Sequence, residues 1–100
     1  MIKHISVFTL KNKEEINDFI EQLNEVAKCP LIVESEVGVN FTPKPEEGLE
    51  GPEFGDVVQI ISFNSKEDLA AYPTSNEHMK LFKEGPQMEK VSAIDYEVKD

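Results

Sequence analysis

Residues 1–10 read MIKHISVFTL, and they decide how the rest of the chain is interpreted. Their β-branched and aromatic residues, with partial alternation of polarity, predict a strand. One face of this strand carries Ile2, His4, Ser6 and Phe8. The opposite face carries Lys3, Ile5, Val7 and Thr9. The alternation therefore places a titratable histidine within a largely apolar segment.

The chain contains two histidines, His4 and His78, and His78 follows Tyr72 at a spacing of six. Histidine has an unperturbed pKa near physiological pH, so both residues are candidates for acid/base chemistry. The structural alternative is that each is a hydrogen-bonded packing residue, because buried polar groups usually find partners. The residues alone leave both interpretations open.

The composition predicts one domain, residues 1–100, with a small core. The hydrophobic fraction of 39% is slightly low for a self-sufficient globule, which favours a core completed by another subunit. A net charge of −10 without a basic stripe argues against nucleic acids and anionic membranes as partners. The single cysteine, Cys29, excludes an internal disulfide and favours a cytoplasmic location. We expect no transmembrane helix and no signal peptide, since no long apolar run occurs and Met1 leads directly into a strand.

The remaining segments predict alternating helices and strands. Asn12 begins an amphipathic helix, which Pro30 ends. Further strands are predicted at residues 31–41, 56–64 and 91–98. Ser65 caps a second helix, which Pro73 breaks, and a short helix follows at residues 76–84. This order predicts an α+β, ferredoxin-like βαββαβ fold with a four-stranded antiparallel sheet and the helices on one face.

Residues 42–55 hold three prolines, three glycines and four glutamates and predict a long exposed loop. Loops of this length are often functional or mobile. Its acidic residues make it a candidate for binding a cation or a protein partner, against the alternative of a solvated loop: Glu46, Glu47, Glu50 and Glu53.

A sheet with helices on one face leaves its other face to be covered. If His4, Ser6 and Phe8 pointed to water, Phe8 would be exposed. A second subunit that laid its sheet against this one would cover such residues. We therefore expect a homodimer whose two sheets form a joint α+β barrel.

Three segments, IKHISVFTL, EDLAAYPTSNEHMKLF and VSAIDYEV, together closely resemble the stress-responsive A/B barrel (Dabb) family over essentially the whole chain. The resemblance implies a dimeric α+β barrel. Members of the family include plant stress-induced proteins and a plant polyketide cyclase, olivetolic acid cyclase. The wider dimeric α/β-barrel group, which the chain also resembles, includes cofactor-free monooxygenases, so the fold alone assigns no reaction.

Carried over residue by residue, the resemblance to the cyclase implies that Tyr72 and His78 are catalytic and that His4 is its first-strand histidine. A further histidine of the cyclase falls on Val57 and is absent here. In an aldol cyclisation, His78 would act as the base and Tyr72 would donate a hydrogen bond to the oxyanion. His4 would orient His78 or line the pocket.

The expected ligand is a small apolar or polyketide-like molecule. Five apolar residues are candidates for its pocket wall, with ordinary core packing as the alternative: Phe8, Leu69, Met79, Leu81 and Phe82. No organic cofactor is expected. The resemblance to some plant relatives implies a magnesium ion at the end of the first helix, held by the backbone carbonyls of Val26, Cys29 and Ile32.

Three functions are compatible with these features. The first is a cofactor-independent enzyme with cyclase- or lyase-like acid/base chemistry. The second is a non-catalytic stress-response or ligand-binding dimer, and the third is a partner-binding module that uses the acidic loop. The first requires Tyr72 and His78 to reach a common cavity.

Overall fold

A computed structural model describes residues 1–41 and 55–99 of the chain. Within them, the strands are β1 (Ile2–Leu10), β2 (Ile32–Val39), β3 (Val57–Phe63) and β4 (Met88–Glu97). The helices are α1 (Ile16–Val26), α2 (Lys66–Ala71) and α3 (Asn76–Glu84), with short 3₁₀ turns η1 (Lys13–Glu15) and η2 (Tyr72–Thr74). The four glutamates predicted to make an acidic loop lie outside the described residues.

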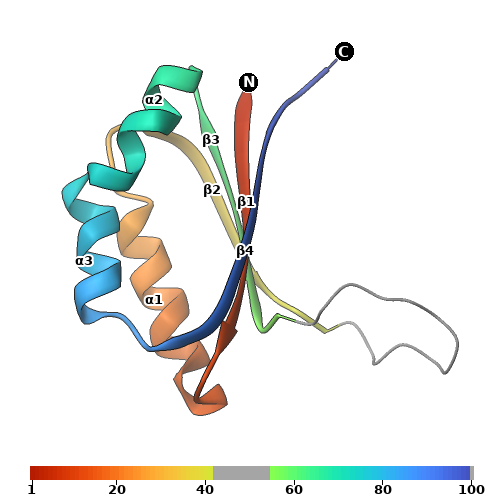
Figure 1. Cartoon of the computed structure of the whole chain (residues 1–100), viewed down its shortest axis with the longest axis vertical. Helices are drawn as coiled ribbons and strands as arrows, with labels where there is room; N and C mark the ends of the chain where they lie inside the picture. Colours follow the sequence, from red (N-terminus) through yellow and green to blue (C-terminus); the bar gives the residue numbers. More distant parts are fainter. Residues whose placement is uncertain (42–54, 100) are drawn as a thin grey trace, which may run out of the picture.

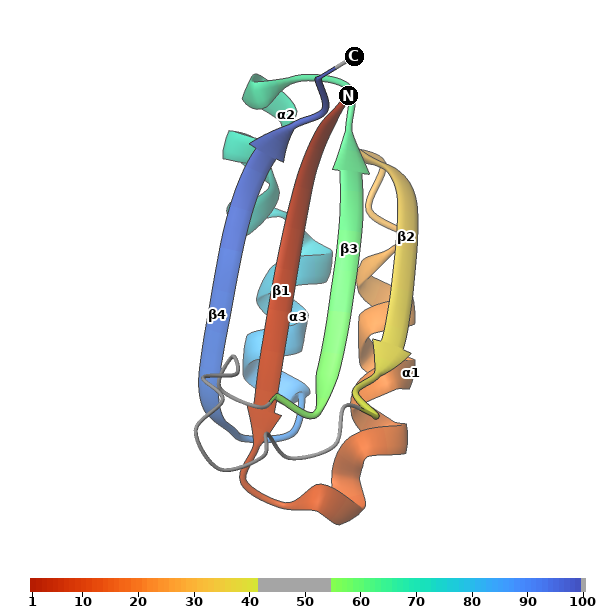
Figure 2. The same cartoon turned by 90° about the vertical axis from the view of Figure 1, so that its right-hand side faces the viewer.

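The strands form one antiparallel sheet in the order β2-β3-β1-β4 (Figure 2). The predicted strand at residues 56–64, which is apolar on both faces, corresponds to β3 and is central. The helices α1, α2 and α3 all lie on the same face of the sheet (Figure 1). The predicted α+β, ferredoxin-like arrangement is therefore confirmed.

The alternation of β1 determines which side chains lie beneath the helices. Ser6 and Phe8 are buried, and the Phe8 ring meets Phe19 of α1 edge to face, with centroids 4.8 Å apart. The face that carries His4, Ser6 and Phe8 is thus the helix-covered face, and the idea that these residues would need a second subunit to cover them is wrong. The uncovered face carries the other set, in which Ile5 pairs with Ile60 and Ile94.

The helices begin at side-chain caps. Ser65 Oγ accepts a hydrogen bond from the Asp68 N–H (3.1 Å), and Ser75 Oγ accepts one from the His78 N–H (3.2 Å). Asn12 instead accepts from the Glu14 N–H (3.0 Å) and caps the 3₁₀ turn, so the first α-helix begins only at Ile16. The last strand begins at Met88, earlier than predicted, because Met88 pairs with Leu10 across an irregularity in β1.

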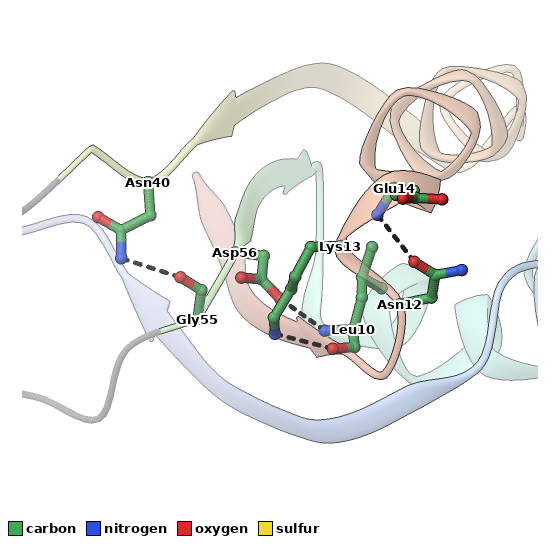
Figure 3. A network of polar contacts seen from close by, with 7 residues as sticks. All are labelled: Leu10, Asn12, Lys13, Glu14, Asn40, Gly55 and Asp56. Carbon is green, nitrogen blue, oxygen red and sulfur yellow. Dashed lines mark hydrogen bonds and ion pairs between the residues drawn. The ribbon is translucent and has the colours of Figure 1, made fainter.

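A half-exposed network joins the end of β1 to the start of β3 (Figure 3). Asp56 Oδ2 accepts hydrogen bonds from the Leu10 N–H (2.7 Å) and from Lys13 Nζ (2.7 Å). Lys13 Nζ also donates to the Leu10 carbonyl (2.8 Å). Nearby, Asn40 Nδ2 donates to the Gly55 carbonyl (2.9 Å). These hydrogen bonds hold the C-terminal end of β1, whereas His4 lies near its N-terminal end.

Replacing Phe8 by alanine should lower the free energy of unfolding by about 3–5 kcal/mol, because the substitution leaves a cavity against Phe19. Denaturant unfolding followed by circular dichroism measures the change. Phe41→Ala is the matched control, since Phe41 is 95% exposed and its truncation should change stability little. Equal effects of the two substitutions would contradict the burial of this face of β1.

Candidate functional site

A pocket of about 370 Å³ is formed by β1, α2, η2, α3 and β4. Its wall contains all three predicted catalytic side chains, His4, Tyr72 and His78. The rest of the lining comes from Lys66, Leu69, Ala70, Pro73 and Asp95. The pocket therefore combines apolar surface with two imidazoles and a phenol, and its volume lies in the range of small-molecule sites.

Tyr72 occupies the break between α2 and α3. Helix α2 ends at Ala71, and the chain continues through Pro73 in the 3₁₀ turn η2. The Tyr72 ring packs against Phe63 and His78, with centroid distances of 5.4 and 4.7 Å. Burial raises the pKa of the Tyr72 phenol above its usual range, so the hydroxyl stays protonated at neutral pH. Tyr72 is therefore a hydrogen-bond donor in the pocket.

His78 lies in the first turn of α3, directly after the Ser75 cap. Its Nδ1 is 3.1 Å from the Pro73 carbonyl oxygen, which can only accept, so Nδ1 carries the proton. Burial lowers the pKa of His78 below its usual value of 6.5; the bond to Pro73 opposes this effect and the neighbouring His4 adds to it. At neutral pH, His78 is thus an uncharged imidazole with a lone pair on Nε2.

His4 is held from two sides. Its Nδ1 donates a hydrogen bond to the Asp95 carboxylate of β4, and its Nε2 lies 2.9 Å from Ser6 Oγ on the same strand. The His4 ring meets the Tyr72 ring edge on, with centroids 6.3 Å apart. The Tyr72 ring therefore contacts both imidazoles of the chain.

The five residues predicted to form the pocket wall lie in different parts of the structure. Leu69 lines the pocket of Tyr72 and His78. Phe8 and Leu81 belong to the buried core, and Met79 is partly exposed on α3. Phe82 is exposed, but its ring packs against His78 at a centroid distance of 4.8 Å. Of the five, only Leu69 contributes to the lining of this pocket.

The end of α1 gives no separate support for magnesium. The carbonyl oxygens of Val26 and Cys29 accept hydrogen bonds from the N–H groups of Cys29 and Ile32, each 3.0 Å long. Residues 1–41 and 55–99 contain no cluster of three or more His, Cys, Asp or Glu side chains suited to a metal ion. These backbone groups fit a hydrogen-bonded turn rather than a cation site.

Asp95, Lys66 and Pro73 line the pocket although the sequence did not single them out. The contact of Asp95 with His4 joins residues 91 positions apart, so it depends on how β1 pairs with β4. The signal available in the sequence is a carboxylate inside the apolar segment VSAIDYEV. A carboxylate in a strand is usually solvated, and this signal becomes informative only when the register is known.

Comparison with known families agrees with the fold described above. The family model described as Stress responsive A/B Barrel Domain (Dabb) matches residues 2–98. The chain belongs to this family. A search among curated proteins gives no significant match.

Three solved structures illustrate the shared fold. A Dabb family protein with a ferredoxin-like fold from Mesorhizobium loti is 20% identical, with a TM-score of 0.76 over 99% of this chain and 97% of that chain. A dimeric ferredoxin-like protein from Thermobifida fusca is 18% identical, with a TM-score of 0.73 over 97% and 90%. A hydroxynitrile lyase from Passiflora edulis is 20% identical, with a TM-score of 0.76 over 99% and 94%. At these identities the likeness establishes the fold.

None of the helices in the described part of the chain has the length and apolar character needed to span a membrane. Cys29 is a free, buried thiol. The cytoplasmic location expected from it stays a prediction.

The midpoint of the His78 imidazole titration should lie below 6.5, because burial disfavours its charged form. Carbon- or nitrogen-detected NMR of the two histidine rings measures it, and the His78 signal is identified by its loss in His78→Gln. A midpoint at or above 6.5 would contradict the environment described for this ring. Because the folded pKa of His78 is lowered, the free energy of unfolding is highest above the unfolded pKa and decreases as the pH falls through the folded pKa.

Proposed function

We propose that the protein is a cofactor-independent acid/base catalyst, lyase- or cyclase-like, that acts on a small carbonyl compound. The observation that carries the proposal is that Tyr72 and His78 line one pocket in complementary protonation states. A protonated phenol and a neutral imidazole are the donor and the base that enolate chemistry needs. The fold shared with a hydroxynitrile lyase supports the same class of reaction.

His78 is the base in this proposal. The Pro73 carbonyl holds the proton on Nδ1, so Nε2 is the atom that removes a proton from the substrate. The substrate proton lies on carbon next to a carbonyl in a cyclisation, or on the hydroxyl group in a lyase reaction. The lowered pKa of His78 keeps the base uncharged at neutral pH.

Tyr72 stabilises the oxyanion that develops as the proton leaves. Its hydroxyl has no hydrogen-bond partner among the described side chains and backbone groups, so it remains available to a substrate oxygen. A donor fixed in a buried site is worth more than the same donor in water, because little reorganisation is needed. Packing of the ring against Phe63 provides this fixed position.

The pocket favours a small, partly apolar molecule, including a polyketide-like chain. Leu69, Ala70 and Pro73 supply apolar wall, and about 370 Å³ accommodates a compact ligand. No metal ion enters the proposal, since the groups named above supply both the base and the electrophile.

We also propose that the protein acts as a homodimer through its uncovered sheet face. Ile5 and Ile60 are half-buried at the centre of this face, and Ile94 beside them is 62% exposed. Apolar residues gathered on one face of a sheet favour burial against a partner. The dimeric state of the ferredoxin-like protein from Thermobifida fusca supports this arrangement.

Exchange of the α-protons of acetophenone and 2-heptanone in D₂O, followed by proton NMR, tests the acid/base proposal. The wild type should accelerate exchange, and Tyr72→Phe and His78→Gln should each lower the rate by about 10²-fold or more. Tyr96→Phe is the matched control, because Tyr96 lies on β4 outside this pocket.

Exchange no faster than in buffer would contradict catalysis. If the ketones then still shifted the Tyr72 and His78 signals, the second candidate, a non-catalytic ligand-binding dimer, would be favoured. The shared pocket of these two side chains is the observation that supports that candidate.

Light scattering coupled to size exclusion should give twice the chain mass of 11.3 kDa for the wild type. Ile94→Asp should shift the protein toward the monomer, because it places a carboxylate in the apolar interface. Met79→Asp is the control, since Met79 is also an exposed apolar side chain (43%) but lies on α3, away from this sheet face. A monomeric wild type, or a dimer unaffected by Ile94→Asp, would contradict the interface.

A further inference from the structure

A second polar arrangement lies beside the pocket and includes neither Tyr72 nor His78. The Asp95 carboxylate binds His4 Nδ1, and Ser6 Oγ lies 2.9 Å from His4 Nε2. An ionised carboxylate can only accept, so Nδ1 carries a proton, and Nε2 is the nitrogen left to accept from the Ser6 hydroxyl. In this connectivity a carboxylate orients an imidazole, and the imidazole activates a serine.

Strand β3 places an amide beside this serine. Gln59 stands directly opposite Ser6 in the antiparallel register, so the two side chains share the helix-covered face. Gln59 is 2% exposed, and its Nε2 has no hydrogen-bond partner among the residues that the structure describes. A buried donor without a partner destabilises the folded protein. Its presence next to Ser6 points to a ligand oxygen as its missing acceptor.

Ser6 is buried on β1, next to the edge strand β4. Its partner on β4 is Ala93, which is small and exposed. His4 and Asp95, the two residues that connect Ser6 to the surface, both line the pocket. Ser6 itself is 3% exposed, so the His4 side chain, which contacts Ser6 and lines the pocket, is what joins the serine to the pocket.

We infer that Ser6 is a nucleophile for acyl transfer from a small uncharged carboxylic ester. His4 is its general base, and Asp95 is the positioning residue that fixes the His4 tautomer. Gln59 Nε2 donates to the oxyanion. An uncharged ester fits because the pocket has an apolar wall and the chain carries a net charge of −10, which repels anions.

The reaction balances with water as the only co-reactant. Ser6 Oγ bonds to the ester carbonyl carbon while its proton moves to His4 Nε2. The bond from this carbon to the alkoxy oxygen then breaks, and the proton on Nε2 passes to the leaving alcohol. Water attacks the acyl-Ser6 ester with His4 again as base, which releases the carboxylic acid and restores Ser6.

This activity goes beyond the proposed acid/base function and uses a different nucleophilic atom. It requires neither the Tyr72 hydroxyl nor His78 Nε2. Covalent capture of Ser6 and exchange of ketone α-protons are separate readouts, so failure of one inference is distinguishable from failure of the other.

Labelling with a biotinylated fluorophosphonate, followed by peptide mass spectrometry, tests the nucleophile. We expect one adduct, on Ser6, that Ser6→Ala abolishes and that Asp95→Asn slows by at least about tenfold. Asp95 is exposed on β4, so this second variant leaves the fold intact. Ser62→Ala is the matched control, because Ser62 is buried to 2% exposure but belongs to the other face of β3. An unlabelled Ser6 in the folded wild type, or labelling that is unchanged in Asp95→Asn, would overturn the inference.

The role of Gln59 as an oxyanion donor is tested separately, by thermal stability and by ester hydrolysis. Gln59→Leu removes an unpaired buried donor, so we expect unchanged or higher thermal stability. The same substitution should lower hydrolysis of p-nitrophenyl butyrate by about 10²-fold, as for loss of one oxyanion donor. A stability loss without a change in the hydrolysis rate would instead assign Gln59 to packing and overturn its catalytic part.

Discussion

The contact between Phe8 of β1 and Phe19 of α1 holds the central strand against the helical layer. It fixes which face of the central strand β1 lies under the helices. Because side chains alternate along a strand, the same contact places His4 and Ser6 on the helix-covered face. Burial of Phe8 therefore determines the location of the polar groups that β1 contributes, His4 and Ser6.

Backbone and side-chain acceptors set the chemistry of the two imidazoles. The Pro73 carbonyl holds a proton on His78, and the Asp95 carboxylate holds one on His4. Each ring therefore has Nε2 as its second nitrogen, on His78 in a ring that packs against Tyr72 and on His4 at 2.9 Å from Ser6 Oγ. The fold thus brings both histidines of the chain to one pocket.

Local features were predictable from the sequence because their causes are local. Ser75 caps α3, and the helix has the predicted bounds, since a hydroxyl two or three residues from the N–H groups it satisfies is sufficient. The six-residue spacing of Tyr72 and His78 places both at the break between α2 and α3, where their rings meet. The family resemblance, which identified these two residues, is confirmed over residues 2–98.

Features that depend on contacts between distant elements were not predictable. The alternation of side chains divides β1 into two faces but does not show which face the helices cover. That depends on the contact of Phe8 with Phe19, which lies in α1. Likewise, the pairing of β4 with β1 places Asp95 beside His4, and the pairing of β3 with β1 places Gln59 beside Ser6. Neither pairing can be read from the local sequence. Phe8 and Leu81 were plausible pocket residues by their apolar character, yet packing places both in the core.

A crystal structure of the protein, purified without dialysis so that a bound molecule is retained, tests whether Tyr72 and His78 share a ligand. We expect a ligand oxygen within hydrogen-bond distance of the Tyr72 hydroxyl, with His78 Nε2 facing the same molecule. We also expect a partner subunit on the face of Ile5 and Ile60. A pocket filled by protein side chains, with Tyr72 and His78 paired to protein atoms, would contradict the assignment of a functional site.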